Sequence, residues 1–316
     1  MAFWRSSIGV VTTVTVLLLS VPASAQQFIN VLTGGTSGVY YPVGVALSQI
    51  FNDKIANSKP QVQATKASVE NLQLLQQGRG EIAFTLGDAL KDAWDGNEEV
   101  GFKAKLAKLR AISSIYPNFV QIVASKESGI KTLADLKGKR LSVGAPKSGT
   151  ELNARAVLKA AGITYADLGK VEYLPFAESV DLMKNRQLDA TLQSAGLGVS
   201  SIRDLATSVD IVVVEIPAEI VAKIGAPYVV DTIPAGTYRG QDAPVKTTAI
   251  GNLLVTHDGV PEAVVYEMTK QIYENLDRVH SSHASAKTMT LQNARQGIPI
   301  PLHPGAERYF KEKGVN

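Results

Sequence analysis

The stretch FINVLTGGTSGVYYP, residues 28–42, places a short apolar strand, a loop of small residues and the start of a helix directly after one another. The same order recurs in RLSVGAPKSGTE, residues 140–151. A helix N-terminus exposes unpaired backbone N–H groups and carries a partial positive charge, so a Gly/Ser/Thr loop that leads into a helix suits an anion. Two such loops predict two lobes with a cleft between them.

Later motifs repeat at the same spacing, which supports a duplication. Ser37 and Ser148 stand at the same interval before SVENL at 68–72 and SVDL at 179–182. A strand-like run that begins with an acid, EIAF or DATL, follows each segment. Each lobe therefore reads as β-loop-α-β-α-β, the pattern of a mostly parallel sheet. Serine matches this short also arise by chance.

The first 25 residues read as an export signal. Arg5 precedes an apolar run at residues 8–19, and Ala23-Ser24-Ala25 forms a small-residue cleavage site before Gln26. The apolar run is shorter than the roughly 20 residues of a membrane-spanning helix. We therefore expect cleavage near Ala25 and a periplasmic mature protein, with an uncleaved membrane anchor as the alternative.

The composition excludes several classes of protein. The chain has no cysteine, which excludes disulfides, thiolate metal sites, a lipid-modified N-terminal cysteine and a cysteine nucleophile. Its formal net charge is +3, or +2 once Arg5 is removed, and the basic residues are scattered. Nucleic acid is therefore not an expected partner. A mature chain of roughly 290 residues is long enough to form two lobes.

Two later runs are predicted to be strands that connect the lobes. FVQIVA at 119–124 follows the turn residues Pro117 and Asn118 and carries the chain into the second lobe. TTAIGNLLV at 247–255 brings the chain back. The stretch from Pro217 to Pro244 is dense in Pro, Gly and Ala and is predicted to be an irregular surface excursion.

These crossings define the expected architecture. Residues 26–117 and 252–316 form lobe 1, and residues 118–251 form lobe 2. Helical patterns at 261–279 and 304–313 should pack on lobe 1. The expected fold class is α/β and two-lobed, with two hinge crossings that let the lobes close over a ligand.

The residues do not point to catalysis. Residues 144–150 have the outline of a phosphate-binding P-loop, but Thr150 stands where the nucleotide-binding lysine is needed. No Gly-x-Ser-x-Gly motif is present, although a triad assembled from distant residues stays open. His280 and His283 have helical spacing, and a solvated helix end is favoured over a metal pair. We expect a protein that is not an enzyme and needs no cofactor or metal.

Two aromatic residues follow the first loop directly. Tyr40 and Tyr41 occupy the predicted first turn of a helix, where their rings could floor the cleft and their hydroxyls could orient a ligand. The alternative is that one ring packs against the sheet while the other points to solvent. For the two loops themselves, the alternative is that they only turn the chain.

Five further motifs are spread along the chain. They are LTGGTSGVYYP at 32–42, SVENL at 68–72, LADLKGK at 133–139, VGAPKSGTE at 143–151 and PLHPG at 301–305. Together these motifs resemble the TAXI family of solute-binding proteins, which serve TRAP transporters. The resemblance covers about residues 28–314, nearly the whole mature chain.

This resemblance implies a periplasmic-binding-protein fold of type II. Such a receptor would capture a small organic acid or amino acid, such as glutamate, 2-oxoglutarate or a similar dicarboxylate. It would deliver this ligand to an integral membrane TRAP permease that an ion gradient drives. The cleft positions that the resemblance transfers to this chain are Thr36, Ser37, Tyr40, Ser68, Asn71, Ser148 and Thr150, with Asp88 and Gln193 at strand ends.

The chain departs from the family pattern at Lys66 and Lys147, where small residues are common, and at the residues before Asp88. Two ammonium groups beside the loops would favour a dianionic ligand through charge-assisted hydrogen bonds. The alternative is that both lysines point to water. Tyr41 and Gly149 complete the predicted site, since Tyr41 follows the first loop and Gly149 belongs to the second.

The leading hypothesis is therefore a transport receptor that holds a carboxylate on the backbone N–H groups of one loop. Two alternatives from other classes stay open. One is a sensor protein that presents its closed form to a membrane kinase, and the other is a periplasmic hydrolase or transferase on the same fold.

Overall fold

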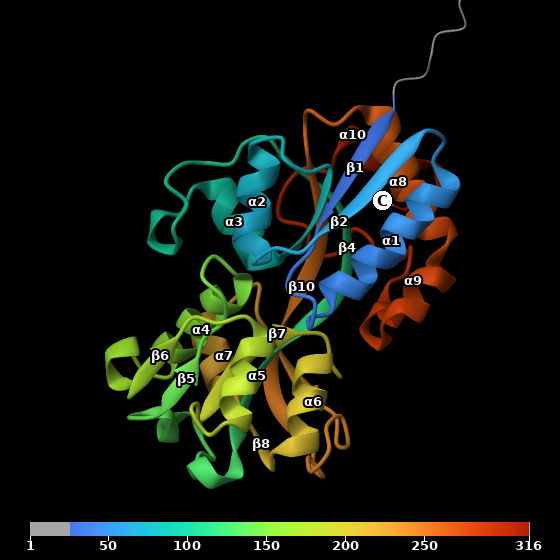
Figure 1. Ribbon diagram of the computed structural model, residues 1–316. Helices are drawn as coiled ribbons and strands as arrows, with labels where there is room; N and C mark the ends of the chain where they lie inside the picture. The colour runs from blue at the N-terminus through green and yellow to red at the C-terminus, as the bar shows by residue number, and fades with distance from the viewer. Residues whose placement is uncertain (1–25, 316) are drawn as a thin grey trace, which may run out of the picture.

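The computed structural model describes residues 26–315, so the predicted signal peptide at residues 1–25 lies outside the described residues. The chain forms one ten-stranded mixed sheet in the order β2-β1-β3-β10-β4-β7-β5-β6, with β8 beside β4 and β9 beside β10 (Figure 1). The strands are β1 (Gln27–Leu32), β2 (Ser58–Gln63), β3 (Ile82–Leu86), β4 (Leu109–Ser125), β5 (Arg140–Ser142), β6 (Lys170–Glu172), β7 (Ala190–Ala195), β8 (Ile211–Val214), β9 (Val229–Ile233) and β10 (Val245–His257).

Each lobe contains the predicted β-loop-α-β-α-β unit. In the first lobe β1 pairs in parallel with β2 and β3, and in the second lobe β5 pairs in parallel with β6 and β7. The duplicated design is therefore confirmed at the level of topology. The helices that connect these strands are α1 (Tyr40–Lys54), α2 (Ser68–Gln76), α4 (Gly149–Ala160) and α5 (Phe176–Lys184).

Two long strands run through both lobes, which confirms the two predicted crossings. β4 pairs with β10 over its first part and with β7 from Phe119 to Ala124. β10 pairs with β9 at its start and with β3 from Asn252 to Val255. The two lobes therefore share one sheet, and the molecule has the two-lobed architecture expected from the sequence (Figure 1).

The turn predicted at Pro117 and Asn118 is wrong, because both residues lie inside β4. Pro117 faces Gly251 of β10, and the ladder between these strands is irregular between Gly251 and Leu253. A proline is tolerated in a strand at such an irregularity because a regular ladder bond to its nitrogen is not required there. The irregularity comes from the pairing of two distant strands and has no local signature.

The stretch from Pro217 to Pro244 is more regular than predicted. It contains helix α7 (Ala218–Ile224) and strand β9, so the expectation of a wholly irregular excursion is wrong. Pro217 stands immediately before α7, a position where a proline does not interrupt helical hydrogen bonds. β9 forms because β10 offers it an edge to pair with, and strand formation depends strongly on such partners.

The C-terminal helices pack on the first lobe, as predicted. Helices α8 (Glu262–Glu274) and α9 (Leu276–Ser282) contact α1, and α10 (Pro304–Glu312) contacts α8 and β4. Both ends of the described chain therefore belong to the first lobe (Figure 1). None of the described helices has the length and apolar character that crossing a membrane requires. The remaining helices are α3 (Gly87–Asp95) and α6 (Ser200–Ser208).

The sheet of the first lobe is covered on both faces, as parallel strands require. Val31 of β1 packs in a core with α1 and α8, and its neighbour Leu32 packs in a second core with α2. The core that contains Val31 continues into the second lobe through Val180 of α5 and Ile202 of α6. Figure 1 shows α2 and α3 on one side of the first lobe's strands and α1, α8 and α9 on the other.

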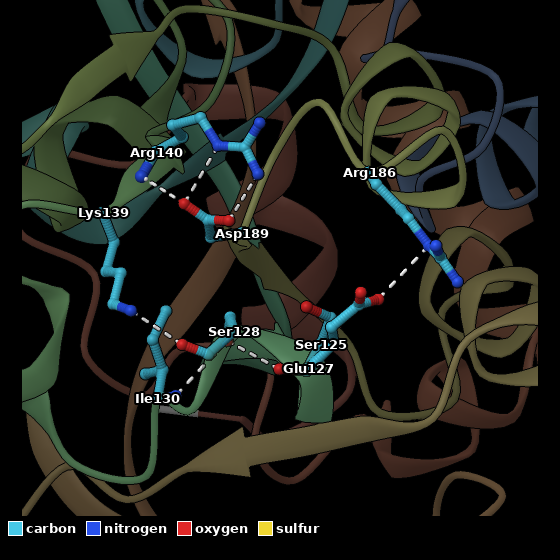
Figure 2. Close-up of polar contacts among 8 residues, drawn as sticks. All are labelled: Ser125, Glu127, Ser128, Ile130, Lys139, Arg140, Arg186 and Asp189. Carbon is cyan, nitrogen blue, oxygen red and sulfur yellow. Dashed lines mark hydrogen bonds and ion pairs between the residues drawn. The ribbon is translucent and has the colours of Figure 1, made fainter.

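A forked ion pair joins the starts of β5 and β7. The backbone N and Nε of Arg140 donate to Asp189 Oδ2 at 2.8 and 3.1 Å, and Nη2 donates to Oδ1 at 2.6 Å (Figure 2). These bonds hold the pKa of the Asp189 carboxyl below its usual range. Figure 2 also shows a second pair, Arg186 with Glu127, whose side chains are 80% and 68% exposed.

Candidate ligand-binding site

A cavity of about 130 Å³ lies between the two lobes. The N-terminal residues of four helices contribute to its wall: α1 and α2 from the first lobe, α4 and α5 from the second. The first N–H groups of a helix have no partner within the helix, and together with the helix dipole they favour negative charge. The helix residues in the wall are Tyr40 of α1, Ser68 of α2, Gly149 and Thr150 of α4 and Phe176 of α5.

The second loop positions the start of α4 through a cap and a tight turn. Ser148 Oγ accepts a hydrogen bond from the backbone N of Glu151 at 3.1 Å, the bond of an N-cap residue. Gly144 has a φ of +97°, and a Cβ at this position would lie 2.7 Å from Thr150 Cγ2. Only glycine fits this turn without strain. As a result Ser148 and Thr150 both line the cavity.

The second loop also touches the first lobe directly. The backbone N of Glu70 in α2 donates to the carbonyl of Lys147 at 3.2 Å. A Cβ added to Gly149 would lie 2.6 Å from both Ser68 Oγ and Leu86 Cδ1. The two lobes are therefore in contact at the starts of α2 and α4, and this arrangement is a closed form of the cleft.

Tyr40 is held in the cavity wall by a ring contact and a hydrogen bond. Its ring stacks on Phe84 with ring centroids 5.0 Å apart. Its hydroxyl donates to Asn252 Oδ1 of β10, and Asn252 Nδ2 donates to the carbonyl of Tyr116 at 2.8 Å. Burial raises the pKa of the Tyr40 hydroxyl well above its usual range. Tyr41 is half-buried and does not line the cavity.

Of the thirteen residues predicted for the site, six line the cavity and seven do not. Among the six, Lys66 is exposed and lies at the rim. Ser37 meets the second lobe elsewhere, since its carbonyl accepts a hydrogen bond from Ser200 Oγ at 2.9 Å. Tyr40, Lys66, Ser68, Ser148, Gly149 and Thr150 line the cavity, whereas Thr36, Ser37, Tyr41, Asn71, Asp88, Lys147 and Gln193 do not.

Two of the residues outside the wall hold the framework behind it. Asn71 is fully buried, and its Nδ2 donates to the carbonyls of Thr33 and Phe84 at 2.7 and 2.8 Å. This amide ties the first loop to β3. Gln193 is also fully buried, and its Oε1 accepts from Ser201 Oγ at 2.6 Å. Their hydrogen bonds give both residues a structural role in this closed form.

Asp88 lies outside the cavity wall but bridges the two lobes. Its Oδ2 accepts hydrogen bonds from Tyr228 Oη at 2.6 Å and from Asn153 Nδ2 at 2.7 Å, and both donors belong to the second lobe. Desolvation raises the pKa of the Asp88 carboxyl to about 6, although the bond from Tyr228 opposes this shift. The nearby carboxylate of Asp92 raises the Asp88 pKa further.

Three polar residues of the wall, Thr65, Asn118 and Ser194, were not predicted from the sequence, and two of them are deeply buried. Asn118 and Ser194 are 3% and 6% exposed. Asn118 lies where β4 crosses between the lobes, and Ser194 lies on the neighbouring strand β7. Asn118 Oδ1 and Ser194 Oγ have no hydrogen-bond partner within residues 26–315. The signal that could have identified them is their position, since Asn118 directly precedes the predicted crossing and Ser194 directly follows Gln193.

Several solved structures have a similar fold at low sequence identity. PhnD1 from Prochlorococcus marinus (MIT 9301), in complex with methylphosphonate, is 11% identical, with a TM-score of 0.58 over 92% of this chain and 98% of that one. The alkanesulfonate-binding protein SsuA from Xanthomonas axonopodis pv. citri, bound to MOPS, is 14% identical, with a TM-score of 0.50 over 92% and 85%. A putative L-cystine ABC transporter protein from Listeria monocytogenes is 12% identical, with a TM-score of 0.52 over 83% and 97%.

These similarities show the fold, which is that of type II periplasmic binding proteins. The family assignment comes from the sequence. The model of the NMT1-like family matches residues 31–314, a range that includes both loops, both crossing strands and every residue of the cavity wall. The chain belongs to the NMT1-like family.

Proposed function

We propose that this protein is a periplasmic solute receptor that captures a small organic anion between its lobes and delivers it to a membrane transporter. The observation that carries the proposal is the meeting of four helix N-termini at one cavity between the lobes. Such termini favour negative charge. The only charged residue in the cavity wall, within the described chain, is Lys66, which is also a cation.

The anion we propose is a small organic acid, with glutamate, 2-oxoglutarate and similar dicarboxylates among the candidates. One carboxylate would accept from the free N–H groups at the start of α4, where Ser148 and Thr150 add hydroxyl donors. Lys66 at the rim is placed to attract a second negative group, and Lys147 is exposed outside the wall. The bound molecules named for the similar PhnD1 and SsuA structures, methylphosphonate and MOPS, are acids as well.

The cavity wall is suited to binding and, within the described residues, lacks the side chains most often used as general acid or base. Within residues 26–315, no histidine, aspartate or glutamate is among the residues that line it. Histidine and carboxyl side chains are among the commonest general acids and bases. We therefore propose a receptor that releases its ligand chemically unchanged.

The transporter we propose is a TRAP permease, as the TAXI-like motifs imply. The closed form would be the signal to this permease, since a ligand that contacts both lobes shifts the population toward closure. We also propose that the lobes meet at the boundaries 117/118 and 251/252. Pro117 and Gly251 face each other there, beside the irregularity of the β4–β10 ladder.

A thermal-shift screen of the chain that begins at Gln26 tests this function. The panel contains glutamate, glutamine, 2-oxoglutarate, C4 dicarboxylates and short monocarboxylates. A ligand at about 100 times its Kd adds roughly 2.7 kcal/mol to the free energy of unfolding, which raises the melting temperature visibly. A shift with at least one acid supports the proposal. The absence of any shift, in protein shown to be folded and free of ligand, contradicts it.

A further inference from the structure

Two residues of the cavity wall each carry a buried side-chain oxygen that lacks a hydrogen-bond partner within the described chain. Asn118 Nδ2 donates to the backbone carbonyl of Ser194 at 3.1 Å, and this bond fixes which end of the amide is the oxygen. Asn118 Oδ1 is left as a buried acceptor, and Ser194 Oγ is left as a buried hydroxyl. Leaving such a group unpaired costs free energy, so buried polar atoms in folded proteins are nearly always hydrogen-bonded.

A ligand that satisfies both oxygens must offer a hydrogen-bond donor at this end of the cavity. Asn118 Oδ1 can only accept, whereas Ser194 Oγ can donate or accept. A hydroxyl group meets both requirements, because it can donate to Asn118 and accept from Ser194. A keto oxygen only accepts, so it would leave Asn118 Oδ1 unpaired and place two acceptors against each other.

An ammonium group could donate to both oxygens, but its charge does not suit this cavity. No carboxylate side chain is in the wall formed by the described residues, and Asp88 lies outside it. The positive ends of four helices and the ammonium of Lys66 repel a second cation. Burying a charge without a partner is strongly unfavourable. The wall therefore disfavours an α-amino acid.

We propose that Asn118 and Ser194 make the cavity selective for an organic anion that carries a hydroxyl group, against its amino, oxo and unsubstituted counterparts. This inference rests on the proposed function, because it assumes that an acid occupies the cavity. It adds the chemistry of the second ligand group, held at the crossing strand β4 and its neighbour β7. The acid group faces the helix termini, and the hydroxyl faces the two unpaired oxygens.

Matched acids of equal chain length test the selectivity by isothermal titration calorimetry. The three-carbon set is lactate, pyruvate, alanine and propionate. The four-carbon set is malate, oxaloacetate, aspartate and succinate, and the five-carbon set is 2-hydroxyglutarate, 2-oxoglutarate, glutamate and glutarate. In the set that fits the cavity, we expect the hydroxy acid to bind at least about 10-fold more tightly than the other three.

Two variants connect this preference to the named residues. Ser194→Ala removes one of the two partners and should reduce the preference for the hydroxy acid over the unsubstituted acid by roughly 10-fold. Asn118→Asp places a carboxylate in the wall and should shift the ranking toward the amino acid. Thr191→Val is the matched control, because Thr191 lies on the same strand and has a buried unpaired hydroxyl but does not line the cavity.

The outcomes separate this inference from the proposed function. A preference for the hydroxy acid that Ser194→Ala weakens and Thr191→Val leaves unchanged supports it. If acids bind but the amino, oxo or unsubstituted member is preferred, or if Ser194→Ala leaves the ranking unchanged, the inference is wrong and the receptor function stands. If no acid of any set binds to the folded protein, both are overturned.

Discussion

Gly149, the first residue of α4, lies so close to Ser68, the first residue of α2, that a β-carbon on the glycine would be 2.6 Å from Ser68 Oγ. These two residues belong to different lobes. The contact therefore exists only while the cleft is closed, and the space for it depends on the missing side chain.

Gly149→Ala should keep the lobes from closing fully. The added methyl group meets Ser68 and Leu86 in the closed form but only solvent once the lobes part. We expect affinity for the acid found in the screen to fall at least about 10-fold, since the competent state becomes a minor population. Calorimetry measures the affinity, and small-angle scattering should show a larger radius of gyration with ligand present.

The control for this variant is Lys159→Ala in the same helix. Lys159 is exposed in the last turn of α4 and does not line the cavity, so this change should leave the affinity unaltered. The stability of Gly149→Ala should stay within about 0.5 kcal/mol of the parent, because the open lobes can fold without strain. Parental affinity in Gly149→Ala would show that closure at this contact is not required.

Ligand affinity should rise as the pH falls, because Asp88 bridges the lobes with a carboxyl pKa raised to about 6 in the closed form. In an open form the carboxyl regains water, and its pKa returns toward the ordinary value. The closed form then binds the proton more tightly, so protonation favours closure. Between pH 7.5 and 5.5 we expect a gain of about fourfold in affinity for an acid that stays ionised.

The same shift predicts how stability changes with pH. A carboxyl whose pKa is raised in the folded state contributes most when protonated. Its contribution is lost as the pH rises from about 4 through about 6, by up to about 3 kcal/mol. Asp88→Asn should flatten both profiles. Asp95→Asn is the control, because Asp95 lies on the same helix but pairs with Lys91 in solvent. This change should leave the pH dependence of both affinity and stability as in the parent. A flat profile in the parent protein argues against the bridge.

Tyr40→Phe should destabilise the protein by about 1–3 kcal/mol, since Asn252 Oδ1 then loses its buried donor. Urea unfolding followed by circular dichroism measures the loss. Tyr41→Phe is the adjacent control, because Tyr41 is only half-buried. Equal stabilities for the two variants would mean that the hydrogen bond from the Tyr40 hydroxyl to Asn252 does not stabilise the protein in solution.

Asp189→Asn should weaken the second lobe by about 1–3 kcal/mol, because it disrupts the charged fork with Arg140 shown in Figure 2. Glu127→Gln in the exposed pair with Arg186 should have no measurable effect. The pKa of Asp189 is lowered in the folded state, so its contribution is present at neutral pH and lost as the pH falls below about 4. Unfolding curves at pH 7 and pH 3 would test both statements.

The sequence predicted those parts of the fold that local signals encode. The two Gly/Ser/Thr loops mark strand-to-helix turns, so their helices and the parallel units around them were identified correctly. The turn at Pro117 and the irregular stretch after Pro217 were wrong because distant strands decide those structures. β9 becomes a strand only where β10 lies beside it.

In the site, too, the residues set by local sequence signals were predicted and those brought together by distant strands were not. Gly149 and Thr150 line the cavity because the loop that carries them leads directly to the helix start. Thr36 stands in the equivalent first loop but is exposed and does not line the cavity. Asn118 and Ser194 are ordinary polar residues in strands, and only the pairing of β4 with β7 brings them together.

Because β1 and α10 both belong to the first lobe, fluorescent proteins fused to the two ends would move as one body and report nothing of closure. An optical sensor needs one dye on each lobe. The chain contains no cysteine, so single thiols can be introduced and labelled with maleimide dyes without side reactions. Phe28 and Tyr173, 57% and 42% exposed on opposite lobes, are suitable positions for such a pair.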